Sequence, residues 1–383
     1  MAFSHPPRQA RRAVLFAGLG AMLALAGCQT GSRSRFPAPG PVGPGPIVPI
    51  DTKRNLVAVI VPTSGADGAV GQSIANAANL ALLDSGDQSL RITVYDSAGP
   101  GGAASAAIKA VGDGNKLILG PLLAEDVRAA APIARRAGVP VVAFSNDEGV
   151  AGRGVYIMGF TPDQSIDRVV RHARGKGMVR FGALVPTGLY GQRASQAMIG
   201  AVRNSGGRIT ALEQFDRSPA AVKAAVGRLK VKGDFDAVLI GDAGRIAAIA
   251  APTLPRAAKL LGTELWASDK GLGKTPALRG AWYAAAPDAR FNQLSGRYRA
   301  RYGKSPYRLA SLGYDAVLLA VRSSRNWPIG RAFPASGLIA QDGFSGVDGN
   351  FRFGRDGIAE RLLEVRQVSA AGATTVSPAG KAF

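Results

Sequence analysis

From residue 55 onward, short apolar runs alternate with longer stretches of helical periodicity. The apolar runs are bounded by turn residues and are predicted to be strands: 55–62, 90–96, 116–120 and 139–145. The helical patterns between them cover 71–84, 101–112 and 124–138. Because single helices connect the strands, and because the strands lack apolar–polar alternation, we predict a parallel sheet with helices on both faces.

The same alternation begins again after residue 160. A capping box at 161–164, with proline at the first helical position, begins a helix predicted over 163–174. Further strands are predicted at 180–186, 208–215 and 235–241, with helices at 191–205 and 219–231. The predicted fold class is therefore α/β, with two doubly wound, Rossmann-like lobes.

The C-terminal part has a different pattern. A strongly apolar helix is predicted over 309–324, and residues 344–368 combine short strand-like runs with the hairpin signals Asp348-Gly349 and Asp356-Gly357. Such an antiparallel segment suits a multi-strand hinge between the lobes. The predicted domains are as follows: first lobe, 55–160 plus about 288–325; second lobe and hinge, 161–287 plus about 326–368; tail, 369–383.

The N-terminus has the features of an export signal. Residues 1–27 combine Arg8, Arg11 and Arg12 with an apolar run that is too short to span a membrane. The following Leu25-Ala26-Gly27-Cys28 resembles the lipobox of bacterial lipoproteins, which implies lipidation of Cys28, the single cysteine. Residues 28–54 are rich in proline and glycine and are predicted to be a linker.

Charge and composition exclude several kinds of chemistry. With 47 Lys and Arg against 26 Asp and Glu, the net charge is +21, but dense basic runs with interleaved aromatic residues are absent, so we expect no nucleic-acid partner. His172 is the one histidine beyond the signal, which leaves too few ligands for a zinc site. The segment 268–275 ends like a phosphate-binding loop, but Ser268 and Pro276 break the pattern. We expect a non-enzymatic protein without metal or cofactor.

Four segments in this order resemble type I periplasmic binding proteins of the branched-chain amino acid binding class, over residues 56–368. They are VPTSGADGAVGQSIANAANLAL, LILGPLLAEDVRAAAPIARRAGVPVVAFS, PTGLYGQRASQAMIGAVRNSGGRI and GFSGVDGNFRFGRDG. The resemblance implies two lobes that close on a ligand beyond the carboxyl ends of their strands. Candidate cleft residues at these strand ends are Ser64, Ser145, Asn146, Asp147, Tyr190, Asp242 and Asp269.

The resemblance also assigns roles to some of these residues. Amino-acid binders of the family hold the ligand carboxylate with hydroxyls and backbone N–H groups of the first lobe, and the ammonium with a carboxylate. It implies that Tyr190 is the cleft tyrosine, that Ser145-Asn146 belongs to the first-lobe clamp, and that Asp269 receives the ammonium. The sequence departs from the family pattern at two places. Pro121-Leu122-Leu123 stands where the family usually has serines, and Asp242-Ala243 stands where it usually has an aromatic residue.

Two functions remain open. The lipobox, the linker and the segment 346–365 are similar to those of lipoproteins that activate penicillin-binding proteins, and Gln29 is compatible with outer-membrane sorting. The first expectation is therefore a regulator of peptidoglycan synthesis, anchored in the periplasm to the outer membrane, with a penicillin-binding protein as partner. The alternative is the substrate-binding subunit of an ABC importer for amino acids or amides, with an ABC permease as partner.

Replacement of Cys28 tests the anchor. The Cys28→Ala variant should move from the membrane fraction to the soluble periplasmic fraction with an unchanged circular dichroism spectrum, because the thiol carries the lipid and lies outside the predicted fold. A variant that still needs detergent for extraction would show that Cys28 is not the anchor.

Overall fold

The computed structural model describes residue 51 and residues 53–383. The predicted export signal, Cys28 and most of the predicted linker lie outside the described residues. Within the described part of the chain, no helix combines the length and the apolar character needed to cross a membrane.

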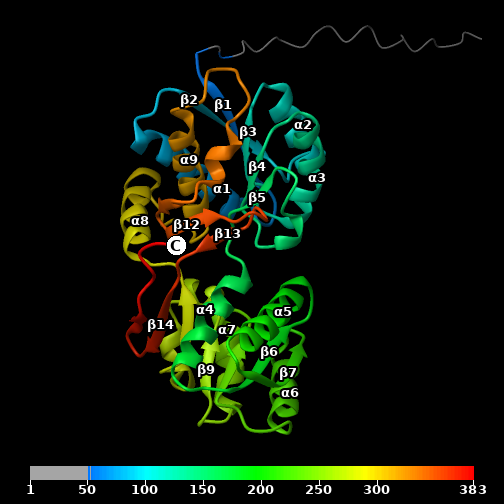
Figure 1. The fold of residues 1–383 in the computed structure, drawn as a ribbon, viewed down its shortest axis with the longest axis vertical. Coiled ribbons are helices and arrows are strands. Elements are labelled where there is room, and N and C mark those ends of the chain that lie inside the picture. Colours follow the sequence, from blue (N-terminus) through cyan, green and yellow to red (C-terminus); the bar gives the residue numbers. More distant parts are fainter. Residues whose placement is uncertain (1–50, 52) are drawn as a thin grey trace, which may run out of the picture. The chain divides into compact units, whose positions relative to one another are not determined.

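The first lobe is a five-stranded parallel sheet in the order β2-β1-β3-β4-β5 (Figure 1). Its strands are β1 (Asn55–Val61), β2 (Leu90–Asp96), β3 (Leu117–Leu119), β4 (Val141–Ala143) and β5 (Val155–Ile157). Its helices are α1 (Gly68–Ser85), α2 (Gly102–Gly112), α3 (Ala124–Arg136) and α9 (Ala310–Ser324). Successive side chains of β1 enter two different cores, because Val57, Val59 and Val61 pack with α1 and α9 while Ala58 and Ile60 pack with α2 and α3.

The second lobe is a seven-stranded sheet in the order β15-β14-β10-β9-β8-β6-β7. Its strands are β6 (Arg180–Pro186), β7 (Arg208–Phe215), β8 (Ala237–Ile240), β9 (Lys259–Gly262), β10 (Trp282–Ala285), β14 (Glu364–Ser369) and β15 (Gly372–Ser377). Helices α4 (Pro162–Gly175) and α5 (Leu189–Asn204) contribute to one core, and α6 (Pro219–Lys230) and α7 (Gly244–Ala250) to the other. Strands β6 to β10 are parallel, and β14 and β15 are antiparallel additions. The predicted α/β fold with two lobes is confirmed.

Both lobes use the same close contact where their first strand meets its helix. A Cβ atom on Gly71 of α1 would overlap the carbonyl oxygen of Pro62, directly after β1. A Cβ atom on Gly191 of α5 would likewise overlap the carbonyl oxygen of Pro186, at the end of β6. Because only glycine permits this approach, each helix begins directly against its strand end, and the loop between them is held at the lobe surface.

The chain passes between the lobes three times, near residues 158–161, 286–288 and 362–363. After the second passage, α8 (Ala289–Tyr302) places Leu294 and Tyr298 in the first-lobe core. A small antiparallel sheet then forms from β11 (Phe344–Gly346), β12 (Gly349–Phe353) and β13 (Ala359–Arg361).

Two predicted domain boundaries differ from the structure. The predicted second lobe and hinge include residues 326–368, but Trp327, Phe333, Phe351 and Phe353 pack in the first-lobe core. The predicted tail 369–383 contains β15, which pairs with β14 in the second-lobe sheet. Both differences arise because the partner of these residues is set by long-range packing, which a local pattern does not contain.

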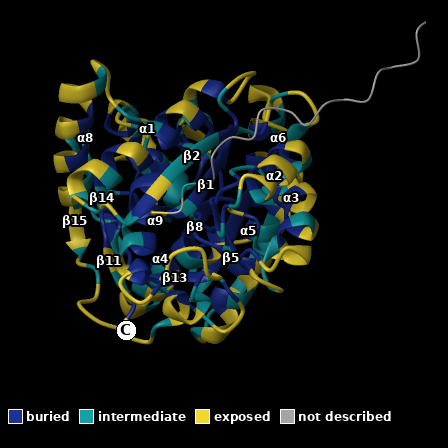
Figure 2. Ribbon diagram, turned by 90° about the horizontal axis from the view of Figure 1, so that it is seen from above, coloured by how far each residue is buried: buried dark blue, intermediate teal, exposed yellow. Residues whose placement is uncertain are grey.

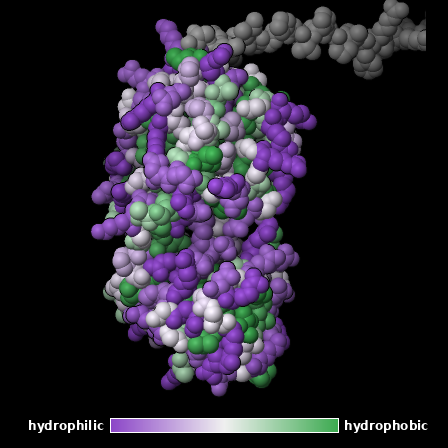
Figure 3. All heavy atoms as spheres, viewed as in Figure 1, coloured by the Kyte–Doolittle hydropathy of each residue, from purple (hydrophilic) through white to green (hydrophobic). Residues whose placement is uncertain are grey.

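Buried residues follow the strands, and exposed residues cover the outer faces of the helices (Figure 2). In the space-filling view, hydrophilic residues cover much of the visible face of both lobes and are interrupted by smaller apolar areas (Figure 3). Large exposed hydrophobic side chains such as Val231 and Ile108 are scattered in the sequence, as is normal for a protein surface.

Four charged residues form a cluster near the passages, here called the hinge charge cluster: the buried Asp315, Asp348 and Arg361 and the partly exposed Arg308. Asp315 and Asp348 are both 0% exposed. Asp315 accepts hydrogen bonds from the backbone N–H groups of Val347 (2.7 Å) and Asp348 (3.3 Å). Arg308 donates to the Asp348 carboxylate, and Arg361 Nη2 donates to the carbonyl oxygen of Met158 at 2.5 Å. Burial, followed by the nearby Asp348 carboxylate, raises the pKa of Asp315 to about 7.

This raised pKa predicts how stability depends on pH. Because the pKa of Asp315 is higher in the folded than in the unfolded state, its contribution to stability is present at low pH and is lost as the pH rises toward 7. Relative to Asp315→Asn, the free energy of unfolding of the wild type should fall by roughly 2 kcal/mol between pH 5 and pH 7, at 1.36 kcal/mol per pKa unit. Urea unfolding at both pH values measures this. Asp234→Asn, at an exposed position, should follow the wild type, and identical pH profiles for wild type and Asp315→Asn would refute the assignment.

Candidate functional site

Residues from both lobes enclose a pocket of about 380 Å³, here called the inter-lobe pocket. It lies beyond the carboxyl ends of the parallel strands, where ligands of α/β proteins bind. Its lining residues are Asp67, Val70, Leu122, Leu123, Phe144, Asn146, Phe160, Glu264, Leu265, Ala267, Ser268, Ala285, Ala286, Arg308 and Leu309.

Most of the pocket wall is apolar. Leu122 and Leu123 connect β3 to α3, and Phe144 directly follows β4, so strand ends of the first lobe supply one side. Leu265 belongs to the 3₁₀ helix Glu264–Ser268, which follows β9 in the second lobe. A ligand in this pocket would therefore transfer apolar surface out of water, which is favourable by about 25 cal/mol per Å².

Glu264 brings a carboxyl group into this apolar wall. The Tyr190 hydroxyl donates to Glu264 Oε1 at 2.9 Å, and the Ser165 hydroxyl donates to Oε2. Burial raises the pKa of Glu264, although the hydrogen bonds from Ser165 and Tyr190 oppose the rise. Burial, followed by the Glu264 charge, also raises the pKa of Tyr190, which therefore stays a neutral donor. The result is a carboxyl group held in a fixed position, whose ionised form would be stabilised by a positive charge in the pocket.

A smaller side pocket of about 230 Å³ shares Leu122, Leu123 and Asn146 with the inter-lobe pocket. Its wall contains an ion-pair group centred on Asp147, whose side chain is 2% exposed. Arg128 of α3 binds one carboxylate oxygen at 2.5 Å, and Arg193 of α5 binds the other at 3.0 Å. Because Asp147 and Arg128 belong to the first lobe and Arg193 to the second, the Arg193 ion pair joins the two lobes.

Three of the predicted cleft residues line these pockets, and a fourth, Ser145, lies next to Asn146 in the sequence. Asn146 lines both, and Asp147 and Tyr190 line the side pocket. Ser145 is buried beside them, and its hydroxyl accepts a hydrogen bond from the Asp147 N–H at 3.1 Å. Its role is thus to fix the loop that carries Asp147.

The other three predicted cleft residues lie elsewhere. The Ser64 hydroxyl is exposed and donates to Asp96 at 2.6 Å, while the buried Asp242 pairs with Arg217 at 2.7 Å. Asp269, predicted to receive an ammonium group, accepts from the Gly271 N–H at 2.7 Å and lines a separate second-lobe cavity. The physical reason is that β9 already ends at Gly262, so Glu264 rather than Asp269 reaches the inter-lobe pocket.

The sequence interpretation did not identify Glu264, Arg193 or Arg308. Glu264 lies in TELWAS, two residues after the end of the apolar strand KLLG, and an acidic residue so close to a strand end is a usable signal. Arg193 and Arg308 have no such signal, because each is one of many arginines and only the fold brings it to the cleft.

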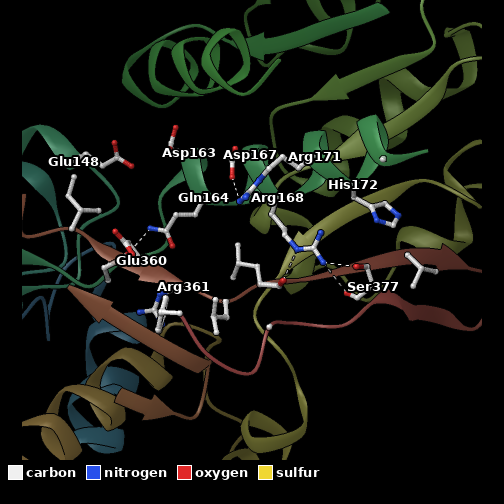
Figure 4. Close-up of a pocket in the computed structure, with 18 of the residues that line it drawn as sticks. Glu148, Asp163, Gln164, Asp167, Arg168, Arg171, His172, Glu360, Arg361 and Ser377 are labelled. Atoms are coloured by element: carbon white, nitrogen blue, oxygen red, sulfur yellow. Dashed lines mark hydrogen bonds and ion pairs between the residues drawn. The ribbon is translucent and has the colours of Figure 1, made fainter. Parts of the chain in front are cut away.

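A larger cavity of about 980 Å³ lies beside the hinge, between α4 and the strands near the C-terminus (Figure 4). Many of its polar groups already have partners: Asp167 pairs with Arg171, and Arg168 donates to the Leu363 carbonyl at 2.9 Å and the Ser377 hydroxyl at 2.6 Å. Burial, followed by Arg168 and Lys176, lowers the pKa of His172, so its imidazole is neutral at neutral pH. Other polar atoms of the lining, among them Nε and Nη1 of Arg361, have no partner within the described residues. The cavity is the weaker candidate because it does not lie beyond the carboxyl ends of the parallel strands, as the inter-lobe pocket does.

In the described residues, no group of three or more His, Cys, Asp or Glu side chains is arranged to hold a metal ion.

A family model described as periplasmic binding protein matches residues 56–373. The chain therefore belongs to the periplasmic binding proteins, and its fold is that of the type I, leucine-binding class.

Solved structures share this fold. A putative branched-chain amino acid ABC transporter protein from Rhodospirillum rubrum is 20% identical with a TM-score of 0.73, over 84% of this chain and 100% of that one. The substrate-binding protein LivJ from Streptococcus pneumoniae, in complex with isoleucine, is 19% identical with a TM-score of 0.63, over 85% and 100%. A solute-binding protein from Rhodopseudomonas palustris, in complex with 3,4-dihydroxybenzoic acid, is 20% identical with a TM-score of 0.65, over 86% and 97%.

One curated relative is an uncharacterized protein of Rickettsia prowazekii, 24% identical over 185 residues. The match covers 48% of this chain and 50% of that protein, so the chain spans about half the length of the curated relative it matches.

The two arginines of Asp147 offer a test of the inter-lobe ion pair. Arg193→Gln should shift the protein toward an open form, with a larger radius of gyration in small-angle X-ray scattering, because the ion pair between lobes is lost. A partly exposed pair of this kind contributes up to about 1 kcal/mol. The ratio of open to closed protein should therefore rise a few-fold. Arg128→Gln is the matched control, since it removes a partner of the same carboxylate within one lobe. Equal radii for the two variants would contradict the inter-lobe role of Arg193.

Proposed function

We propose that this chain is the solute-binding component of an ABC-type importer and that its inter-lobe pocket takes an apolar α-amino acid. The observation that carries the proposal is the Glu264 carboxyl group, which lines a mainly apolar pocket between the lobes and is held by two hydroxyl donors.

The Glu264 carboxyl group favours a ligand with an ammonium group. Its raised pKa reflects the unfavourable burial of negative charge, and a cation placed beside the carboxylate would stabilise that charge. The hydroxyls of Tyr190 and Ser165 fix the carboxylate before the ligand arrives, so little side-chain entropy is lost on binding. An aromatic acid such as the 3,4-dihydroxybenzoic acid held by the Rhodopseudomonas palustris protein has no cationic group to pair with this carboxylate.

The size and walls of the pocket favour an apolar side chain. A volume of about 380 Å³ lies at the small end of the range for ligand pockets. Leu122, Leu123 and Leu265 offer aliphatic contacts, and the Streptococcus pneumoniae relative, whose structure holds isoleucine, takes a ligand of this kind. Leucine and isoleucine are therefore the first ligands to test.

The two-lobed arrangement suits capture by closure. The pocket draws its wall from both lobes, and three passages of the chain form the hinge between them. A ligand that contacts both lobes stabilises the closed form by the difference between its affinities for the two states.

The remaining parts of the proposal concern location and partners. A periplasmic location follows from the export signal and the family, and Cys28 would tether the protein to a membrane, with an ABC permease as partner. The transporter-type relatives support import over regulation of a penicillin-binding protein. The regulatory function and outer-membrane anchoring stay predictions from the sequence.

Glu264→Gln tests the proposed function. Leucine or isoleucine should bind the wild type in isothermal titration calorimetry, and the variant should bind about 10- to 100-fold more weakly, because a hydrogen bond to a charged group contributes about 1.5–3 kcal/mol. Glu213→Gln is the matched control, since Glu213 pairs with Arg228 and Lys232 outside the pocket. Equal affinity of wild type and Glu264→Gln, or binding of benzoate in place of amino acids, would contradict the proposed ligand class.

A further inference from the structure

The first-lobe side of the inter-lobe pocket has few groups that could receive a ligand carboxylate. Leu122 and Leu123 have no hydrogen-bonding side chains. Apart from Arg308, the Asn146 amide is the one side-chain N–H donor among the described first-lobe residues that line the pocket, and Asp67 would repel an anion. A carboxylate buried there without a donor would be destabilised by several kcal/mol.

Arg308 is the one full positive charge among the described residues that line the pocket. It directly precedes Leu309 and α9, and its side chain is 16% exposed. The guanidinium therefore reaches the pocket from the first lobe, whereas Glu264 reaches it from the second.

The guanidinium is fixed in place by the residues behind it. Nη1 donates to the Asp348 carboxylate and lies 3.1 Å from the Ser311 hydroxyl, while the Phe291 ring centroid is 4.2 Å from the guanidinium carbon. Nη2 has a longer contact, 4.0 Å, with Asp288. Within the described residues, both hydrogen bonds of this guanidinium use Nη1. Nε and Nη2, which makes only the longer Asp288 contact, therefore keep hydrogen-bonding capacity for a planar acceptor such as a carboxylate.

The charges of the hinge charge cluster also bear on whether the Arg308 guanidinium can bind a ligand carboxylate. Two arginines, Arg308 and Arg361, face two aspartates, but the raised pKa of Asp315 leaves part of that negative charge neutralised at neutral pH. Within the described residues, the buried Nε and Nη1 atoms of Arg361 have no hydrogen-bond partner. Of the four residues in this cluster, Arg308 is the one that lines the inter-lobe pocket, so its guanidinium is the positive charge that a ligand there would meet.

We propose that Arg308 binds the α-carboxylate of the ligand, in place of the missing first-lobe hydroxyls. This inference rests on the proposed function, in which Glu264 binds the α-ammonium group. Each charge of a zwitterionic amino acid then contacts a different lobe, so that only a ligand with both charges holds the lobes together. Arg308 is in this sense the residue that selects acids over their amides.

Three ligands with the same apolar side chain test the proposal by calorimetry: leucine, leucinamide, which lacks the carboxylate, and 4-methylpentanoate, which lacks the ammonium group. The wild type should bind leucine at least about tenfold more tightly than leucinamide, as expected for loss of a charge-assisted hydrogen bond. Arg308→Gln should weaken leucine binding to the level of leucinamide and leave leucinamide binding unchanged. Arg290→Gln is the control, because Arg290 contacts Ser345 and Gly346 outside the pocket.

Loss of Arg308 leaves the buried Asp348 carboxylate without its arginine, so the paired variant Arg308→Gln with Asp348→Asn provides a second test in which both charges are removed.

The proposal is overturned if wild type binds leucinamide as well as leucine, or if the paired variant still prefers leucine. Leucine binding that depends on Glu264 but not on Arg308 would overturn this inference and leave the proposed function intact. Absence of binding by leucine, leucinamide and 4-methylpentanoate would overturn both.

Discussion

The hinge region depends on the burial of two carboxylates, Asp315 and Asp348, neither of which contacts water. A buried carboxylate must be paired, hydrogen-bonded or protonated, and here all three solutions are used: backbone N–H groups and a raised pKa for Asp315, and Arg308 for Asp348. The arginines come from the segment before α9 and from the strand that leads into the last passage between the lobes. The same charges that hold the hinge together therefore place one guanidinium at the pocket wall.

Much of the fold could be predicted from the sequence because parallel strands are covered on both faces. The residues of β1 enter two cores in alternation, so they form an unbroken apolar run that is easy to recognise. The edge strand β15, GATTVS, has one neighbouring strand and mostly exposed or half-buried side chains, so its local pattern does not distinguish it from a polar tail. The aromatic residues Phe351 and Phe353 indicated strands, but their partner core depends on contacts with distant segments.

The residues of the candidate site could be predicted where they lie close to the end of a strand. Asn146 and Asp147 follow β4, and Tyr190 lies in the first turn of α5, so the parallel topology alone brings them to the cleft. Glu264 was missed because the sequence analysis predicts no strand over residues 259–262 and takes Asp269, further along the chain, as the acidic residue at a strand end. Arg308 lies neither at a strand end nor in a motif, and its position results from all three passages of the chain, which no local pattern contains.

The ion pair between Asp147 and Arg193 has a consequence for the speed of release. It is separate from the inter-lobe pocket, yet it must break whenever the lobes part, so it adds to the barrier for opening whatever solute is inside. Arg193 is one-third exposed, and dissolved ions screen such a pair. If the pocket takes a solute as proposed, the rate at which the lobes open should depend on ionic strength, whereas the preference for one solute over another is set by the separate pocket wall.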